Sequence, residues 1–244
     1  MARGTRLRSG RQGRSLSVVL ADTQTIARTA LRCLLEYVYG VKVIGEVSDG
    51  LKVASTVARL KPHVVVIDFE LTGLSALDVP LDVRRRSPRV GIVVLSQSLR
   101  DLHVIQALRN GATAYVVKRA GPKELVRAIV KSAAGERYVS TPLSRRPLSA
   151  WLARADRGPR DGYDALTLRE REVLHLVSQG LRATTIARRL AISSRTVEAH
   201  RARIKSKLGL PNHPAMVRYA VERQMTTPAS HDGGETLSSR QRSG

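Results

Sequence analysis

The chain has 244 residues, and with 42 lysines and arginines against 20 acidic residues it carries a formal net charge of +22. This length suffices for two domains, and so large a positive charge either favours an acidic polymer such as nucleic acid as partner or serves solubility alone. The single cysteine, Cys33, excludes an internal disulfide, and no apolar run approaches the roughly 20 residues that span a bilayer, so a cytoplasmic protein is predicted.

The first half of the chain alternates short runs of β-branched residues with longer segments of helical period. The runs predict strands at residues 17–21, 41–45, 64–67, 90–95 and 114–117. Apolar residues three and four apart predict helices at residues 26–38, 51–60, 102–108 and 124–133. A further helix is expected after Ser75, where Pro80 fits only within the first turn. Nearly continuous apolar strands are typical of a parallel sheet covered on both faces, so residues 16–136 are predicted to form a doubly wound α/β domain with a parallel five-stranded sheet.

Three segments lack sustained periodicity. Residues 1–15 are predicted to form a basic disordered arm, whose five arginines either contact phosphates or are simply solvated. The proline- and arginine-containing residues 137–163 predict a linker in which Trp151 and Leu152 pack on a neighbour. The polar, glycine-rich residues 226–244 predict a disordered tail.

Residues 164–225 have helical period throughout and predict an all-α four-helix domain. Thr167 and Glu170 have the spacing of a capping box, and Gly180 is placed to end the helix that they begin. The following helices are predicted at residues 184–190, at residues 194–208 and from Asn212 and Pro214 onward.

The second and third of these helices, joined by a tight turn, have the helix-turn-helix geometry that places a helix in the major groove of DNA. With Val197 turned inward, the outer face of helix 194–208 is basic, and its small alanines allow close approach to base edges. The predicted DNA-binding residues are Thr184, Arg195, Thr196, Glu198, Ala199, Arg201, Ala202, Arg203, Lys205 and Lys207. Glu198 either accepts from a cytosine amino group or pairs with Arg201 or Arg195. On geometry alone, a module that binds a protein through its basic face is the alternative.

The same segment resembles the LuxR-type helix-turn-helix over its full length. The residues that carry the resemblance are 166–174, Gly180, Ile186, Ala187, Leu190, Ser193, Thr196, Val197, His200, Ile204, Lys207 and Leu208. The resemblance implies that positions 198, 199 and 202 face bases, that the basic residues around them hold phosphates, and that a homodimer forms through the last helix. Several relatives have lysines at the reading positions, whereas this chain has Glu198, Ala199 and Ala202, so the target sequence does not carry over.

In the α/β domain, four polar residues lie where predicted strands end. Functional residues of parallel sheets gather at the carboxyl ends of the strands, and here these positions hold Asp22, Asp68, Ser96 and Lys118. Such a set predicts a site that binds Mg²⁺ on Asp22 and Asp68 and receives a phosphoryl group on Asp68, with Ser96 and Lys118 contacting the phosphoryl oxygens.

This placement resembles the receiver domain of two-component response regulators, and a receiver joined to a LuxR-type module is a common family architecture. Tyr115 resembles the aromatic residue that pairs with the switch hydroxyl. Thr23 stands where receivers usually have a second acid, and Thr72 stands where they usually have a proline. The loss of an acid weakens divalent binding, which puts Mg²⁺ in doubt. Glu70 either supplies a substitute carboxylate or faces solvent.

These features predict a DNA-binding transcriptional regulator rather than an enzyme, because the chain has no GxGxxG, P-loop or GxSxG sequence. The receiver-like domain is expected to gate the helix-turn-helix in one of two ways. Either a histidine kinase phosphorylates Asp68, or an atypical receiver responds to a small ligand or a partner without phosphorylation. The alternative function is a protein-interaction adaptor without specific DNA binding.

Overall fold

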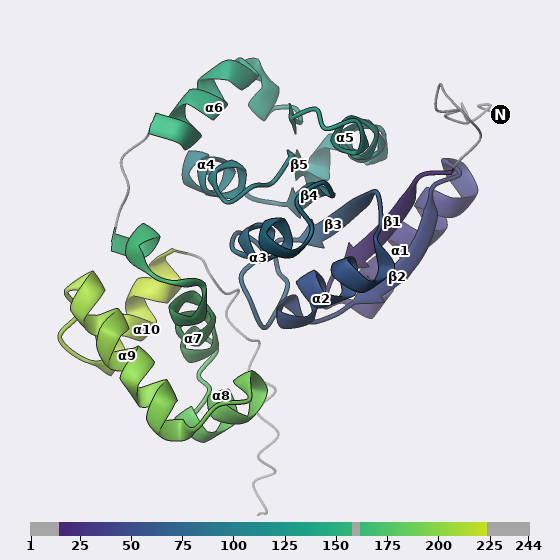
Figure 1. Cartoon of the computed structure of the whole chain (residues 1–244). Coiled ribbons are helices and arrows are strands. Elements are labelled where there is room, and N and C mark those ends of the chain that lie inside the picture. Colours follow the sequence, from purple (N-terminus) through teal and green to yellow (C-terminus); the bar gives the residue numbers. More distant parts are fainter. Residues whose placement is uncertain (1–14, 158–161, 224–244) are drawn as a thin grey trace, which may run out of the picture.

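A computed structural model of the chain describes residues 15–157 and 162–223. The arm predicted at residues 1–15, apart from Ser15, and the tail predicted at residues 226–244 lie outside the described residues. The described chain forms an α/β half followed by a helical half (Figure 1).

The α/β half is built on one parallel sheet with the strand order β2-β1-β3-β4-β5-β6. The strands are β1 (Ser17–Ala21), β2 (Lys42–Val47), β3 (Val64–Asp68), β4 (Gly91–Ser96), β5 (Ala114–Val117) and β6 (Tyr138–Val139). The doubly wound parallel sheet is confirmed, but it has six strands rather than the predicted five. The sixth was missed because β6 has two residues, too few to show a strand pattern.

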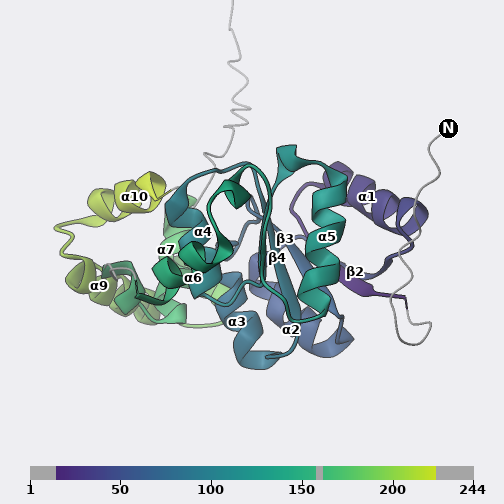
Figure 2. The ribbon, with the colours of Figure 1, turned by 90° about the horizontal axis from the view of Figure 1, so that it is seen from above.

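Helices cover both faces of this sheet, as its continuous apolar strands require. They are α1 (Thr25–Cys33), which continues into a π-helical turn at Leu34–Val38, α2 (Gly50–Leu60), α3 (Val79–Arg86), α4 (Asp101–Arg109) and α5 (Pro122–Ala133). Helices α1 and α5 lie on one face, and α2, α3 and α4 lie on the other (Figures 1 and 2). Because successive strand residues point to opposite faces, Val18 and Leu20 belong to the core beneath α5, whereas Val19 and Ala21 belong to the core beneath α2 and α3. In α3, Pro80 lies in the first turn, as predicted.

The segment predicted as a linker contains a strand and a further helix, α6 (Leu148–Arg157), which lies along α4. Trp151 anchors it, because the indole is 1% exposed and its Nε1 donates to the backbone oxygen of Leu143 at 3.3 Å. The guanidinium of Arg146 lies over the same ring, 4.6 Å from its centroid. The prolines and arginines around α6 interrupt the apolar period by which a helix is recognised in a sequence.

The helical half encloses an apolar core of its own. Its helices are α7 (Leu168–Ser178), α8 (Ala183–Leu190), α9 (Ser194–Leu208) and α10 (His213–Glu222). The capping box predicted at Thr167 and Glu170 is present. Ser193 and Asn212 likewise accept backbone hydrogen bonds at the starts of α9 and α10. Within residues 15–157 and 162–223, every helix is too short or too polar to cross a bilayer.

A buried histidine in the helical core makes stability depend on pH. His175 is 1% exposed, and burial lowers the pKa of its imidazole to about 4 from the ordinary 6.5. The unfolded chain therefore binds a proton at a higher pH than the folded chain. This contribution to stability is complete above about pH 6.5 and is lost as the pH falls toward 4, by about 1.4 kcal/mol per pH unit.

We expect His175→Leu to remove this part of the acid sensitivity. The measurement is the free energy of unfolding in urea between pH 7 and pH 4.5. The slope of that free energy against pH should be about 1.4 kcal/mol per pH unit smaller in the variant than in the wild type. An equal slope in both proteins would contradict the assignment.

Candidate functional site

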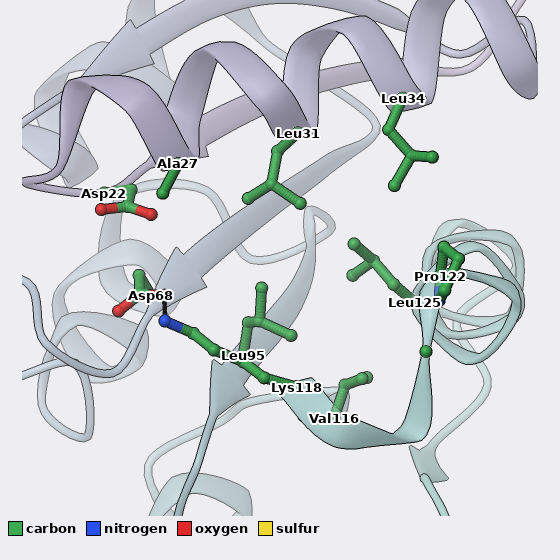
Figure 3. Close-up of a pocket in the computed structure, with 11 residues that line it drawn as sticks. Asp22, Ala27, Leu31, Leu34, Asp68, Leu95, Val116, Lys118, Pro122 and Leu125 are labelled. Atoms are coloured by element: carbon green, nitrogen blue, oxygen red, sulfur yellow. Dashed lines mark ion pairs between the residues drawn. The ribbon is translucent and has the colours of Figure 1, made fainter.

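Three strand ends bring the predicted pocket residues together (Figure 3). Asp22 follows β1, Asp68 ends β3 and Lys118 follows β5. The ammonium Nζ of Lys118 lies 2.6 Å from Oδ2 of Asp68, and Oδ1 of Asp68 accepts from the backbone N–H of Glu70 at 2.9 Å. Both carboxylate oxygens of Asp68, a residue that is 3% exposed, are therefore engaged within the protein.

Asp22 is about as buried as Asp68, but only one of its two carboxylate oxygens accepts a hydrogen bond. Its Oδ1 accepts from the backbone N–H of Gln24 at 2.7 Å, whereas its buried Oδ2 has no hydrogen-bond partner in the described part of the chain. Burial raises the pKa of the Asp22 carboxyl above its ordinary value against the effect of the Gln24 hydrogen bond, and the negative charge of Asp68 raises it further. Asp22 is the group in the pocket that still needs a donor.

The two residues that depart from the receiver pattern contact each other. The backbone N–H of Thr72 donates to Oγ1 of Thr23 at 3.1 Å, and this hydroxyl reaches the backbone oxygen of Ser48 at 3.3 Å. A proline at position 72 could not donate this hydrogen bond. Thr23 and Thr72 thus form a direct link between the loops that follow β1 and β3.

Glu70 does not restore the missing acid. Its carboxylate accepts from the side-chain amide of Gln24 at 3.2 Å, and it does not line the cavity beside Asp22. Among residues 15–157 and 162–223, no three histidine, cysteine, aspartate or glutamate side chains are grouped to hold a metal ion. A divalent cation would find two carboxylates, Asp22 and Asp68, and Asp68 is paired with Lys118 in this structure.

The predicted switch residues lie together on the neighbouring strands. Ser96, fully buried at the end of β4, accepts from the backbone N–H of Ser98 at 3.0 Å. Tyr115 is also fully buried, and its hydroxyl donates to the backbone oxygen of Ser98 at 3.1 Å. Burial raises the pKa of Tyr115 to about 12, against the effect of the hydroxyls of Ser96 and Ser98, so the phenol remains a neutral donor.

Helix α9, which carries most of the predicted DNA-binding residues, lies on the side of the helical half that is remote from the sheet (Figures 1 and 2). The exposed members of the predicted DNA-binding set are Thr184, Arg195, Thr196, Glu198, Ala199, Ala202, Arg203 and Lys207, whereas Lys205 and Arg201 are partly buried.

Two of the basic residues are already paired. Arg201 contacts Glu198 at 2.9 Å and the backbone oxygen of Leu181 at 3.3 Å. Nζ of Lys207 lies 2.7 Å from Oε2 of Glu170. The pairing of Glu198 and Arg201 was one of the two alternatives for Glu198.

Comparisons with known proteins agree with this division into halves. Residues 18–130 match the model of the response regulator receiver domain, and residues 164–220 match that of the bacterial regulatory proteins of the luxR family. The chain is a response regulator of the LuxR type. It is therefore a transcription regulator in which a receiver-like domain precedes a helix-turn-helix domain.

Individual relatives of this response regulator cover most of its length. The oxygen regulatory protein NreC of Staphylococcus aureus is 29% identical over 214 residues, which is 86% of this chain and 99% of NreC. A LuxR-family two-component response regulator from Aurantimonas is 25% identical with a TM-score of 0.53, over 57% of this chain and 99% of that one. The RcsB chain in an RcsB–DNA complex is 25% identical with a TM-score of 0.51, over 85% of this chain and 98% of that one. Receiver domains commonly bind Mg²⁺.

The contact that joins the two halves of the response regulator was not predicted. Asp78, at the start of α3, has no exposure to solvent. Its Oδ1 lies 2.8 Å from Nη1 of Arg171 on α7 and accepts from the side-chain amide of Asn110 at 3.2 Å, while its Oδ2 accepts from the hydroxyl of Tyr163. The sequence has no local signal for this contact, because Asp78 and Arg171 are 93 positions apart.

Further pairs surround this buried contact. Arg109 on α4 lies 2.8 Å from Asp164, and Arg189 on α8 lies 3.2 Å from Asp49 at the start of α2. The guanidinium of Arg171 also lies over the ring of Tyr163, 4.7 Å from its centroid. The helical half is thus held against α2, α3 and α4 by charge pairs, of which the pair of Asp78 and Arg171 is the most buried.

We expect Arg171→Met to destabilise the junction by about 3–5 kcal/mol, because it leaves the Asp78 carboxylate buried without a cation. The matched control is Arg189→Met, which breaks a more exposed pair between the same halves and should cost about 1 kcal/mol or less. The measurement is urea unfolding followed by probes in each half. A cost for Arg171→Met no larger than that of the control would contradict a structural role for the buried pair.

Proposed function

We propose that this response regulator binds duplex DNA through α9 and that its receiver-like half controls this binding without phosphorylation of Asp68. The exposed basic face of α9 is the observation that carries the first part of the proposal, DNA binding. The absence of a second acid beside Asp22, where Thr23 is instead hydrogen-bonded to Thr72, carries the second part.

DNA binding is supported by the composition of the exposed face. Ala199 and Ala202 leave room for base edges, and Arg195 and Arg203 are exposed on the same face to contact phosphates. The RcsB–DNA complex supports the same use of the module. With Arg201 and Lys207 paired internally, Arg195 and Arg203 are the strongest candidates for phosphate contacts. A homodimer on DNA through α10 is part of the proposal, and Val221 on that helix is an exposed apolar residue, at 45%.

We expect Arg203→Ala to weaken binding to duplex DNA of any sequence and to reduce the slope of log affinity against log salt by about one. The measurement is fluorescence anisotropy with a labelled duplex at several salt concentrations. Arg85→Ala, at an exposed position on α3, is the matched control and should leave the slope unchanged. A wild-type affinity that does not depend on salt would instead favour the protein-interaction adaptor.

Control without phosphorylation is supported by the state of the pocket. Phosphoryl transfer to a carboxylate needs a free oxygen and compensation for the incoming negative charge. Here Thr23 stands where receivers usually have a second acid beside Asp22, and the loss of an acid weakens divalent binding. The ion pair of Asp78 with Arg171 connects the receiver-like half directly to α7. A conformational change in the receiver-like half can reach the helix-turn-helix through this contact.

We expect no mass gain when the protein is incubated with Mg²⁺ and acetyl phosphate and its intact mass is measured. DNA affinity should also be the same with and without this phosphodonor. The control variant is Asp68→Asn, which removes the phosphoacceptor. A gain of one phosphoryl group in the wild type that is absent from Asp68→Asn would overturn the proposal in favour of phosphorylation by a histidine kinase.

A further inference from the structure

A cavity of about 330 Å³ lies between α1 and α5 and opens at one end onto Asp22, Asp68 and Lys118 (Figure 3). Its walls are mainly apolar, with Leu31 on α1 and Leu125 on α5 facing each other across it. The volume is within the range of small-molecule sites, which are typically apolar with a few convergent polar groups.

Helix α1, which forms one wall of the cavity, makes charged contacts with the sheet. No side chain of α1 is fully buried. The helix is tied instead to β2, where Arg28 and Arg32 lie 2.7 Å and 2.6 Å from the two carboxylate oxygens of Glu46. On the side of α1 that faces α5, Leu31 is only partly buried and lines the cavity.

The polar end of the cavity needs one more positive charge. Two carboxylates, Asp22 and Asp68, face one ammonium, Lys118, so the ionised set carries a net charge of −1. Lys118 is paired with Asp68, and Oδ2 of Asp22 is buried without a hydrogen-bond partner among the described residues. A buried carboxylate oxygen of this kind costs free energy until a donor reaches it.

We propose that this cavity binds a small amphipathic primary amine. Its ammonium group donates to Oδ2 of Asp22, which completes the charge balance, and its apolar body lies between Leu31 and Leu125. A carboxylate ligand is excluded because it would face two carboxylates. A metal ion would leave the apolar walls of the cavity unused. Binding itself is independent of the proposed function, whereas an effect of the amine on DNA binding rests on it.

The test is isothermal titration calorimetry of the full chain with hexylamine, 1-hexanol and hexanoate, in the absence of DNA. These probes share one apolar body and differ in the polar group. We expect hexylamine to bind at least about tenfold more tightly than hexanol, since a hydrogen bond to a charged group is worth this much, and hexanoate not to bind. Equal affinity for amine and alcohol, or binding of hexanoate, would overturn the proposal without any variant being needed.

Two variants locate the site. Asp22→Asn should lower the affinity for hexylamine to that for hexanol, and Leu31→Trp, which fills the cavity, should abolish binding of both. Ile26→Ala, on the same helix but 86% exposed, is the matched control and should bind hexylamine as the wild type does. Unchanged hexylamine affinity in folded Leu31→Trp would place the amine elsewhere. Because DNA is absent, failure here is distinct from failure of the α9 face to bind DNA.

Discussion

A carboxylate without access to water must be neutralised inside the protein, and Asp78 meets this requirement with a cation from the other half of the chain. The Arg171 guanidinium, the Tyr163 hydroxyl and the Asn110 amide surround it. Removing either partner of the pair of Asp78 and Arg171 would leave the other charge buried without compensation. The positions of α7 and of the α9 face that follows it in the chain depend on this contact.

The pocket at the strand ends shows how a receiver-like site can keep its shape after losing part of its chemistry. In the family pattern a second acid and a proline stand at the positions of Thr23 and Thr72. Here the threonine pair joins the same two loops by a hydrogen bond of 3.1 Å. Asp68 is held by Lys118, and Oδ2 of Asp22 has no hydrogen-bond partner among the described residues.

How much of the structure can be predicted from the sequence depends on how far apart in the chain the interacting residues lie. The β-branched runs predict five of the six strands, because β1, β3, β4 and β5 are almost wholly buried and therefore apolar. They also place Asp22, Asp68 and Lys118 at one end of the sheet. The capping box at Thr167 is local and is also predicted. By contrast, β6 and α6 are stabilised by packing against β5 and α4.

The charge pairs between elements cannot be predicted from the sequence either, because their partners lie far apart in the chain. Asp78 and Arg171 look like ordinary surface residues in their own segments, and nothing nearby in the sequence shows that they meet. The internal pairing of Lys207 with Glu170 also joins residues on different helices, which leaves this lysine a weaker candidate for a phosphate contact than its place on the helix suggested. Patterns within one element are therefore visible in the sequence, whereas the partners of charged side chains between elements are not.

The alternation of side chains along β5 has a structural consequence. Val116 lines the cavity beside α5, while its neighbours Tyr115 and Val117 belong to the opposite core, which also holds α4 and Trp151 of α6. Successive residues of β5 therefore contribute to both faces of the sheet. This one strand separates the cavity from the layer of helices on which the helix-turn-helix rests.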